Sequence, residues 1–547
     1  MFEVIILNRQ KSVKKGRIYI VSIAVGAFTG LICVAFRYTV AQITLLRPLL
    51  FNHKNPLTAH IGVFLSIFLA LLVTGWLVKK FPKISGSGLP QTQALMSGRR
   101  VYNSPFKYLV VKFIGGLLTL CSGLSLGREG TSVQMGSLTG YVTSTLLKIP
   151  QGKRSHLIAA GAGAGVAAAF TAPLSSSILI MESLQKMTIS TTLVCTLLAG
   201  TVAGTIAKVI TPYNIYDSIT VVTPPMEQWQ PLLAMTLLAL FFALAGKLFS
   251  AMLLKGKRLY RYLMERIKGS TVLNNKALSN ETAALVIQAF ALALCTWTVG
   301  LFFTDMIGGD QTFLVKESTI EGFLQKDILN SHILTSITNI LILASLTIII
   351  GTFTILSHAS GYPGGIFLPM MTIGGLLGKL FYDIIVLCLG GCAENLSGYY
   401  ILIGMSTFFI AVMRTPITGF VLISEMTGHY ETFFPTLVAG TLVYYFTQLM
   451  GVRPLNDILY DFMIGQQTQE SSTATVYIDI ESQSYFCGRQ ISGINLPQEC
   501  TICEVVRNKK AIPIGPSLIL EDGDQVGIAI KSEDIERLYR SIVSLGH

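Results

Sequence analysis

Charged residues are scarce in this chain of 547 residues: Asp, Glu, Lys and Arg make up only 13% of it. Soluble domains carry about 25%, so the composition excludes an ordinary soluble fold. Hydrophobic residues make up 51%, and the mean hydropathy is +0.60. Apolar runs long enough to cross a bilayer recur, for example at residues 18–36, 61–78, 231–253 and 334–356. The composition therefore predicts a multi-pass membrane protein.

Histidine is also scarce, with seven dispersed copies, and the chain has no nucleophile elbow or metal-ligand spacing. Glu182 and Glu425 each end an apolar helix and form no recognised catalytic pair. The nine cysteines are scattered, and the Cys500-x-x-Cys503 pair near Cys487 lacks a second pair or a nearby histidine. We expect no enzyme, no metal site and no cofactor.

The formal net charge of +12 does not indicate nucleic-acid binding, because the basic residues flank the apolar spans. Basic residues precede the first span and crowd residues 255–268, whereas residues 304–330 are mainly acidic. Since positive charge favours the cytoplasmic side, we expect the N-terminus and residues 255–268 in the cytoplasm. An odd number of crossings then separates residues 255–268 from the acidic loop. We expect no cleavable signal peptide, since the basic start leads into a full-length span.

Three glycine-rich breaks interrupt the hydrophobic pattern, at residues 86–90, 127–130 and 364–369. Irregular backbone at membrane depth is tolerated only where it is buried in protein or lines a cavity. Each break resembles the start of a helix, and helix N-termini attract anions. Glu129 is a carboxylate tethered at such a start. It is either a gate that leaves an anion site when protonated, or an acid that merely stabilises its helix.

The chain also contains an internal repeat. Pro173 precedes Glu182 by nine residues, Pro416 precedes Glu425 by nine, and the apolar spacing between them is the same. Paired, interrupted segments in two halves indicate a transporter with its site at the repeat interface. Chance similarity between apolar helices is the poorer explanation.

The composition changes after residue 465. We divide the chain into a membrane domain (1–465), a polar linker (466–475) and a small α+β domain (476–547). Strands are predicted at 476–480, 501–506 and 525–530, with a turn at 521–524 and a final helix capped by Ser532. About seventy residues form only a modest core, so we expect this domain to dimerise.

The segments GSGLP (86–90), GREG (127–130) and GIFLP (365–369) resemble the three signature motifs of CLC chloride channels and proton/chloride antiporters, in the family's order. The likeness spans essentially residues 15–465. It implies a mainly helical, inverted-repeat membrane domain and a homodimer in the cell membrane, with a separate chloride pathway in each subunit.

The resemblance also implies roles for individual residues. It assigns the Ser87 hydroxyl and the backbone amides of Ile366 and Phe367 to the central chloride site, and Glu129 to the external gate. Partial positive charges suit chloride, because a full charge at the site would hold the ion too tightly. Lys112 matches a lysine that raises the potential, although a snorkelling side chain is the alternative. The remaining pathway positions are Gly86, Gly88, Gly127, Arg128, Gly130 and Gly365.

Several positions depart from the family's pattern. Ser183 replaces the internal proton-transfer glutamate, beside Glu182, and Asn456 replaces a pore-facing tyrosine, although Asn456 can still donate a hydrogen bond to the anion. Further departures are Gln91, Gln93 and Thr131. The proton-path candidates are therefore Glu129, Glu182 and Ser183, linked by water. We favour a proton-coupled chloride antiporter; an uncoupled voltage- or ligand-gated channel and a fluoride/proton antiporter remain as alternatives. Ser87 argues against fluoride, whereas Thr131 leaves that alternative open.

The tail resembles the TrkA-C subdomain of RCK-type regulators of potassium transport, through residues 488–491, 496–497 and 520–524. No Gly-x-Gly-x-x-Gly precedes it, so the NAD-binding half is absent, and the lack of a CBS pair favours a prokaryotic source. Related tails bind small regulators, including cyclic dinucleotides, which makes such a ligand a hypothesis here. A potassium transporter would need a Thr-Val-Gly-Tyr-like filter, which the chain lacks.

Overall fold

The computed structural model describes residues 2–51, 56–99, 101–185, 190–211, 221–222, 229–268, 280–307, 336–389, 396–464, 473–480, 484–497, 499–507 and 510–531. Seven helices of this part are long and apolar enough to span a bilayer, which confirms the multi-pass prediction. The longer helices are α1 (Phe2–Phe51), α2 (Pro56–Lys80), α4 (Pro105–Cys121), α5 (Glu129–Leu146), α6 (Gln151–Phe170), α8 (Ser190–Ile210), α9 (Trp229–Lys268), α10 (Asn280–Ile307), α12 (Ser336–Ala359), α13 (Phe367–Leu389), α14 (Ser397–Met413) and α16 (Phe433–Leu449).

Four shorter helices complete the membrane domain: α3 (Leu89–Met96), α7 (Pro173–Leu179), α15 (Pro416–Thr427) and α17 (Leu455–Ile464). At 1.5 Å per residue, none of them can cross a bilayer. Proline stands in the first turn of α3, α7 and α15, where its fixed φ suits a helix and its missing N–H costs nothing. Short single-turn elements lie at Pro82–Ile84 (η1), Ile180–Gln185 (η2, a π-helix that continues α7) and Tyr430–Thr432 (η5).

The internal repeat has a structural counterpart, because α5–α6–α7 and α13–α14–α15 share the same construction. Gly136 of α5 and Gly161 of α6 touch so closely that a Cβ on either would overlap the other's carbonyl oxygen, and Gly374 of α13 meets Gly404 of α14 in the same way. Both α6 and α14 end on a residue with positive φ, followed by a proline-led helix: Thr171 (55°) and Arg414 (61°).

The C-terminal domain contains a four-stranded antiparallel sheet in the order β1-β4-β2-β3. Its strands are β1 (Thr473–Asp479), β2 (Cys500–Arg507), β3 (Lys510–Ile512) and β4 (Gln525–Lys531), and a short turn, η7, covers Ile491–Gly493. The three predicted strands and the turn are confirmed, and Gly523 has the positive φ (92°) that such a turn requires. The predicted linker is wrong in its last three residues, since β1 begins at Thr473, and β3 was not predicted. The helix predicted from Ser532 lies outside the described residues.

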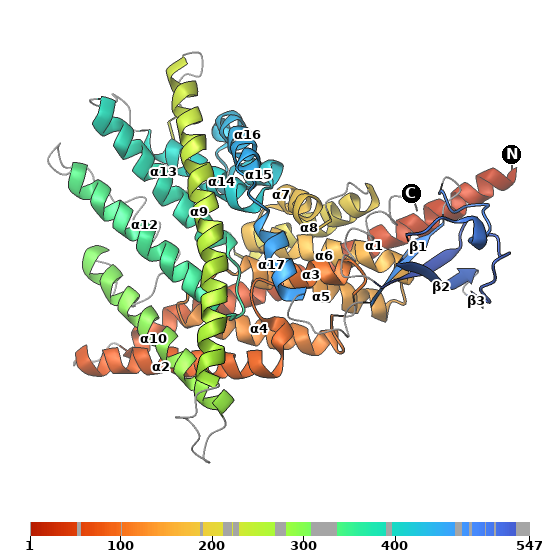
Figure 1. Ribbon diagram of the computed structural model, residues 1–547, viewed down its shortest axis with the longest axis horizontal. Coiled ribbons are helices and arrows are strands. Elements are labelled where there is room, and N and C mark those ends of the chain that lie inside the picture. Colours follow the sequence, from red (N-terminus) through yellow and green to blue (C-terminus); the bar gives the residue numbers. More distant parts are fainter. Residues whose placement is uncertain are drawn as a thin grey trace.

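Figure 1 shows α9 crossing the full height of the view as one long helix, with α2 and α10 side by side. Strand β1 contacts α6. One spanning helix, α10, lies between residues 255–268 and residue 308. This single described crossing agrees with the odd number that the charge pattern predicts.

Candidate anion pathway

The three glycine-rich breaks meet in space. Gly127 donates its N–H to the Gly365 oxygen at 2.8 Å, and Gly365 donates in return at 2.6 Å. Gly364 donates to the Gly86 oxygen at 3.2 Å, and Gly86 donates to Gly361 at 3.3 Å. Segments nearly 280 residues apart therefore form one connected backbone structure, from which α3, α5 and α13 begin.

Gly130 marks the point of closest approach. A Cβ at this residue would lie 2.5 Å from the Ser87 oxygen and 2.8 Å from Gly365 Cα. The first N–H groups of a helix have no partner within the helix, and its dipole adds positive potential there. The structure thus brings the segments of Ser87, Ile366 and Phe367 together, and all three residues are at most 3% exposed. The buried Ser87 hydroxyl has no hydrogen-bond partner among the described residues.

Glu129 is the first residue of α5, and its side chain is fully buried. The carboxylate folds back over Gly127, so that Oε2 occupies the space that a Cβ on Gly127 would need. Gly127 must therefore be glycine for this conformation. Arg128 immediately precedes α5, and Gly88, with a φ of 81°, immediately precedes α3. The carboxyl group of Glu129 therefore lies where three helix starts converge.

Lys112 of α4 supports the loop before Ser87. Its ammonium donates to the Ile84 and Gly86 oxygens, each at 2.8 Å, and the side chain is completely buried. The snorkelling alternative is therefore wrong. Gln91 holds the same loop by donating to the Ser85 oxygen at 2.9 Å.

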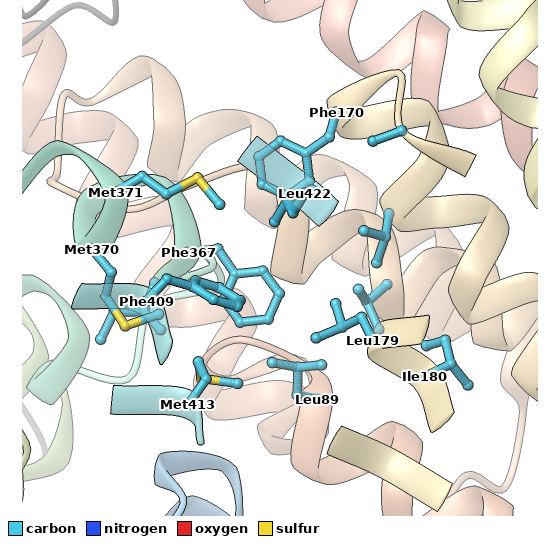
Figure 2. Close-up of a cluster of buried hydrophobic side chains, with 14 of the residues drawn as sticks. Leu89, Phe170, Leu179, Ile180, Phe367, Met370, Met371, Phe409, Met413 and Leu422 are labelled. Carbon is cyan, nitrogen blue, oxygen red and sulfur yellow. The ribbon is translucent and has the colours of Figure 1, made fainter. Parts of the chain in front are cut away.

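The region beside the meeting point is apolar. Figure 2 shows the Phe367 ring next to Phe409, with Leu89, Leu179 and Leu422 directed at the same cluster. The two rings meet edge to face, with centroids 5.3 Å apart. Excluding water from this side lowers the local dielectric, which strengthens the electrostatic effect of the nearby helix starts and carboxylate.

Asn456 on α17 joins three elements. Its amide nitrogen donates to Gln93 Oε1 of α3 at 2.7 Å and to the Ser183 backbone oxygen of η2 at 3.4 Å. Because a backbone carbonyl can only accept, the Ser183 oxygen fixes which end of the amide carries the hydrogens. The donors of Asn456 therefore face protein acceptors. To donate to an anion, as predicted, the amide would have to turn away from both.

Gln93 was noted in the sequence only as a departure from the family, and its contact with Asn456 was missed. The available signal was its position: Gln91 and Gln93 lie on the short helix α3, which begins just after Ser87 and Gly88. The hydroxyl of Ser183 is buried and, among the described residues, has no hydrogen-bond partner.

Glu182 and Glu425 cap each other's helices. Glu182 accepts hydrogen bonds from the N–H groups of Ile417 (3.1 Å) and Thr418 (2.8 Å) and from the Thr418 hydroxyl (2.6 Å), at the start of α15. Glu425 likewise accepts from the N–H of Leu174 (3.0 Å), the N–H of Ser175 (2.9 Å) and the Ser175 hydroxyl (2.7 Å), at the start of α7. The sequence showed the repeated glutamate but not this exchange.

A polytopic bundle whose broken helices direct their N-termini at one buried point is a membrane anion transporter in its construction. The family model described as "Voltage gated chloride channel" matches residues 70–448, and the TrkA-C domain model matches residues 475–543. The chain therefore belongs to the voltage-gated chloride channel (CLC) family and carries a C-terminal TrkA-C domain.

Similar curated proteins include the H(+)/Cl(-) exchange transporters ClcA of Vibrio cholerae and Citrobacter koseri. The first is 29% identical over 462 residues, covering 82% of this chain and 90% of the relative. The second is 28% identical over 464 residues, covering 83% of this chain and 90% of the relative.

Solved structures share the fold. A slow cyanobacterial Cl−/H+ antiporter matches with a TM-score of 0.68 and 22% identity, covering 83% of this chain and 99% of that chain. A eukaryotic CLC transporter matches with a TM-score of 0.65 and 17% identity, covering 96% of this chain and 89% of that chain. A CLC-type fluoride/proton antiporter matches with a TM-score of 0.56 and 17% identity, covering 79% of this chain and 96% of that chain.

Proposed function

We propose that this protein exchanges chloride for protons across the cell membrane, with Glu129 as the gate. The observation that carries the proposal is the buried Glu129 carboxylate, folded over Gly127 where α3, α5 and α13 begin. The names of the ClcA relatives and the antiporter fold support it.

The proposed exchange follows from competition for positive potential. An ionised Glu129 side chain is held by the helix starts, and protonation removes the charge that holds it. The neutral side chain then leaves, and chloride takes its place, bound by the Ser87 hydroxyl and the amides of Ile366 and Phe367. Donors that carry only partial charge let the ion leave again.

The proton needs a further path. We propose that water held by the Ser183 hydroxyl and the Asn456 side-chain oxygen, both buried and without protein donors among the described residues, links Glu129 to the other side. Glu182 is the weaker candidate, because both of its oxygens already accept hydrogen bonds from α15.

An uncoupled chloride channel is the second candidate. It is favoured by Ser183, which cannot carry a proton as a carboxylic acid does, and by the capping role of Glu182. Ser87, which suits chloride, places fluoride exchange third.

The test uses liposomes with an inward chloride gradient and no proton gradient, with external pH and chloride recorded together for the wild type and Glu129→Gln. We expect chloride entry to drive protons out of the liposomes, which acidifies the external medium, in the wild type and not in the variant. Chloride flux without proton movement would identify an uncoupled channel or carrier. Fluoride flux without chloride flux would refute the assignment of the central site.

We further propose that the protein is a homodimer, with the N-terminus and the TrkA-C domain in the cytoplasm and a small regulatory ligand on that domain.

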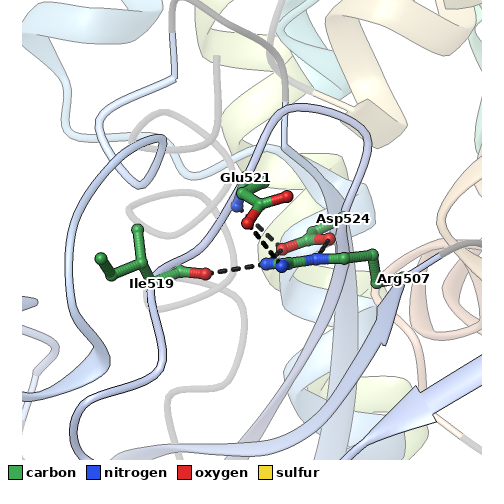
Figure 3. A network of polar contacts seen from close by, with 4 residues as sticks. All are labelled: Arg507, Ile519, Glu521 and Asp524. Carbon is green, nitrogen blue, oxygen red and sulfur yellow. Dashed lines mark hydrogen bonds and ion pairs between the residues drawn. The ribbon is translucent and has the colours of Figure 1, made fainter.

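Arg507 of the TrkA-C domain is not available to a phosphate group of such a ligand, because Asp524, Glu521 and the Ile519 oxygen occupy its guanidinium (Figure 3). Calorimetry with cyclic dinucleotides on the intact protein tests the ligand, and chemical cross-linking in membranes tests the dimer.

A further inference from the structure

A buried histidine lies outside the pathway described so far. His358, in the last turn of α12, is 2% exposed, and neither ring nitrogen has a hydrogen-bond partner among the described residues. An imidazole ring has a polar atom at both of these positions. Since a buried polar atom without a partner is costly, this side chain indicates a ligand that the protein itself does not supply.

Helix α9 brings a cation and a hydroxyl to the same place. Gly256 packs so tightly on α12 that a Cβ there would lie 2.7 Å from a methyl carbon of Ile355, one turn before His358. The next residue, Lys257, carries an ammonium group on the same turn of α9. One turn further along α9, the Tyr260 hydroxyl is buried and has no partner among the described residues.

Helix α17 contacts the same part of α9. The Arg261 guanidinium stacks on the Phe462 ring at 4.1 Å, and the Lys257 ammonium lies 5.4 Å from the same ring centroid. In the described part of the chain, neither cation forms an ion pair with a carboxylate. Their positive charge is therefore not neutralised locally and attracts an anion.

We propose that Lys257, Tyr260 and His358 form a second anion site, which takes a small inorganic anion such as chloride. The donors are an ammonium, a phenol O–H and an imidazole N–H, which can replace the water around a weakly hydrated anion. The two sites adjoin through Gly361: its N–H donates to the His358 backbone oxygen, and its own oxygen accepts from Gly86 and Ser85 in the loop before Ser87. The proposal rests on chloride being the transported ion.

The first experiment is direct. Crystals of the intact protein are grown in bromide, and anomalous scattering locates the ion in the wild type, Lys257→Gln and Lys255→Gln. Lys255→Gln is the matched control, because it removes the same charge from an exposed position on the same helix. We expect bromide between α9 and α12 in the wild type and in the control, and none in Lys257→Gln.

The second experiment measures chloride flux in liposomes with chloride presented from the side that carries the C-terminal domain. Lys257→Gln and Tyr260→Phe should raise the KM for chloride about tenfold, as expected for one lost charge-assisted hydrogen bond, while Lys255→Gln leaves it unchanged. Tyr260→Phe removes a single oxygen, so the test survives if the lysine variant fails to fold.

The outcomes separate this proposal from the antiport on which it rests. If bromide occupies only the Ser87 site and the KM is unchanged, the second site is refuted while chloride transport stands. If His358→Phe abolishes proton movement with an unchanged KM, the histidine belongs to the proton path and the anion site is refuted. If the wild type moves no chloride and binds no bromide, both proposals fail.

Discussion

The exchanged caps of Glu182 and Glu425 allow a quantitative prediction. Glu425→Ala removes the acceptor of three hydrogen bonds at the start of α7. Hydrogen bonds to charged groups contribute about 1.5–3 kcal/mol each, and loss of a helix cap costs about 0.5–2 kcal/mol. Because the Leu174 N–H lies at an exposed position and regains water, we expect unfolding to become easier by about 3 kcal/mol in this case. Glu182→Ala, which removes the equivalent cap at the start of α15, should destabilise the protein by the same amount.

The assay compares thermal unfolding in detergent with the chloride-to-proton ratio in liposomes, for each variant. Ser175→Ala removes only the hydroxyl donor to Glu425 and should cost about 1 kcal/mol. Gln does not replace Glu at either cap, since its NH2 group would face backbone N–H donors. Helices α7 and α15 pack against each other, so the double Ala variant should lose less than the sum of the single losses.

The two roles open to Glu182 give opposite results in this assay. If Glu182 is a helix cap, Glu182→Gln lowers the stability against thermal unfolding, and the folded fraction exchanges ions at the wild-type chloride-to-proton ratio. If Glu182 carries protons, Glu182→Gln changes the chloride-to-proton ratio. A Glu182→Gln protein with unchanged unfolding and no proton movement would refute the capping argument.

Three further predictions follow from single contacts. Gly127→Ala displaces the carboxylate folded over it, so chloride flux should lose its dependence on external pH, measured at acidic and neutral pH; a wild-type pH profile would contradict the placement. Gln93→Leu leaves a buried amide nitrogen of Asn456 short of an acceptor, which should cost about 1–3 kcal/mol in thermal unfolding and lower the proton-to-chloride ratio; unchanged unfolding would contradict the importance of this contact. Arg507→Met breaks the ion pair with the buried Asp524 and should destabilise the TrkA-C domain by about 3 kcal/mol, seen as faster limited proteolysis. Hydrogen bonding to Asp524 raises the pKa of Arg507. The stability that this ion pair contributes is complete below the unfolded-state pKa of Arg507 and is lost only above its folded-state pKa. The destabilisation by Arg507→Met should therefore be equal at neutral and mildly alkaline pH.

Much of the fold could be predicted because a bilayer imposes strong constraints on sequence. Spanning helices need long apolar runs, and a broken helix needs glycine and proline at the break. These signals are local, which is why the spans and the three helix starts were predicted. Strand β3 was missed because three residues give no period to recognise.

The site was predictable in its parts but not in its contacts. Ser87, Glu129 and Phe367 each lie at or just before the start of a helix, and all helix N-termini attract anions. Which carbonyls Lys112 holds depends on how α4 packs, and no local pattern encodes that. The caps lay closest to prediction, because a proline and a glutamate at equal spacing in both halves of an inverted repeat are placed to exchange partners.

The departures from the family's pattern are connected in space. Along the chain, Gln93, Ser183 and Asn456 are independent exceptions, yet one amide group touches the Gln93 side chain and the Ser183 backbone. All three side chains are neutral and buried, so an acid at any one position would place an unpaired charge beside amide groups in a region of low dielectric. Gln93, Ser183 and Asn456 therefore lie together in one buried network of neutral hydrogen-bonding groups. Such a network can conduct protons only through water that it orders, which is why the measured proton-to-chloride ratio decides how this member of the family works.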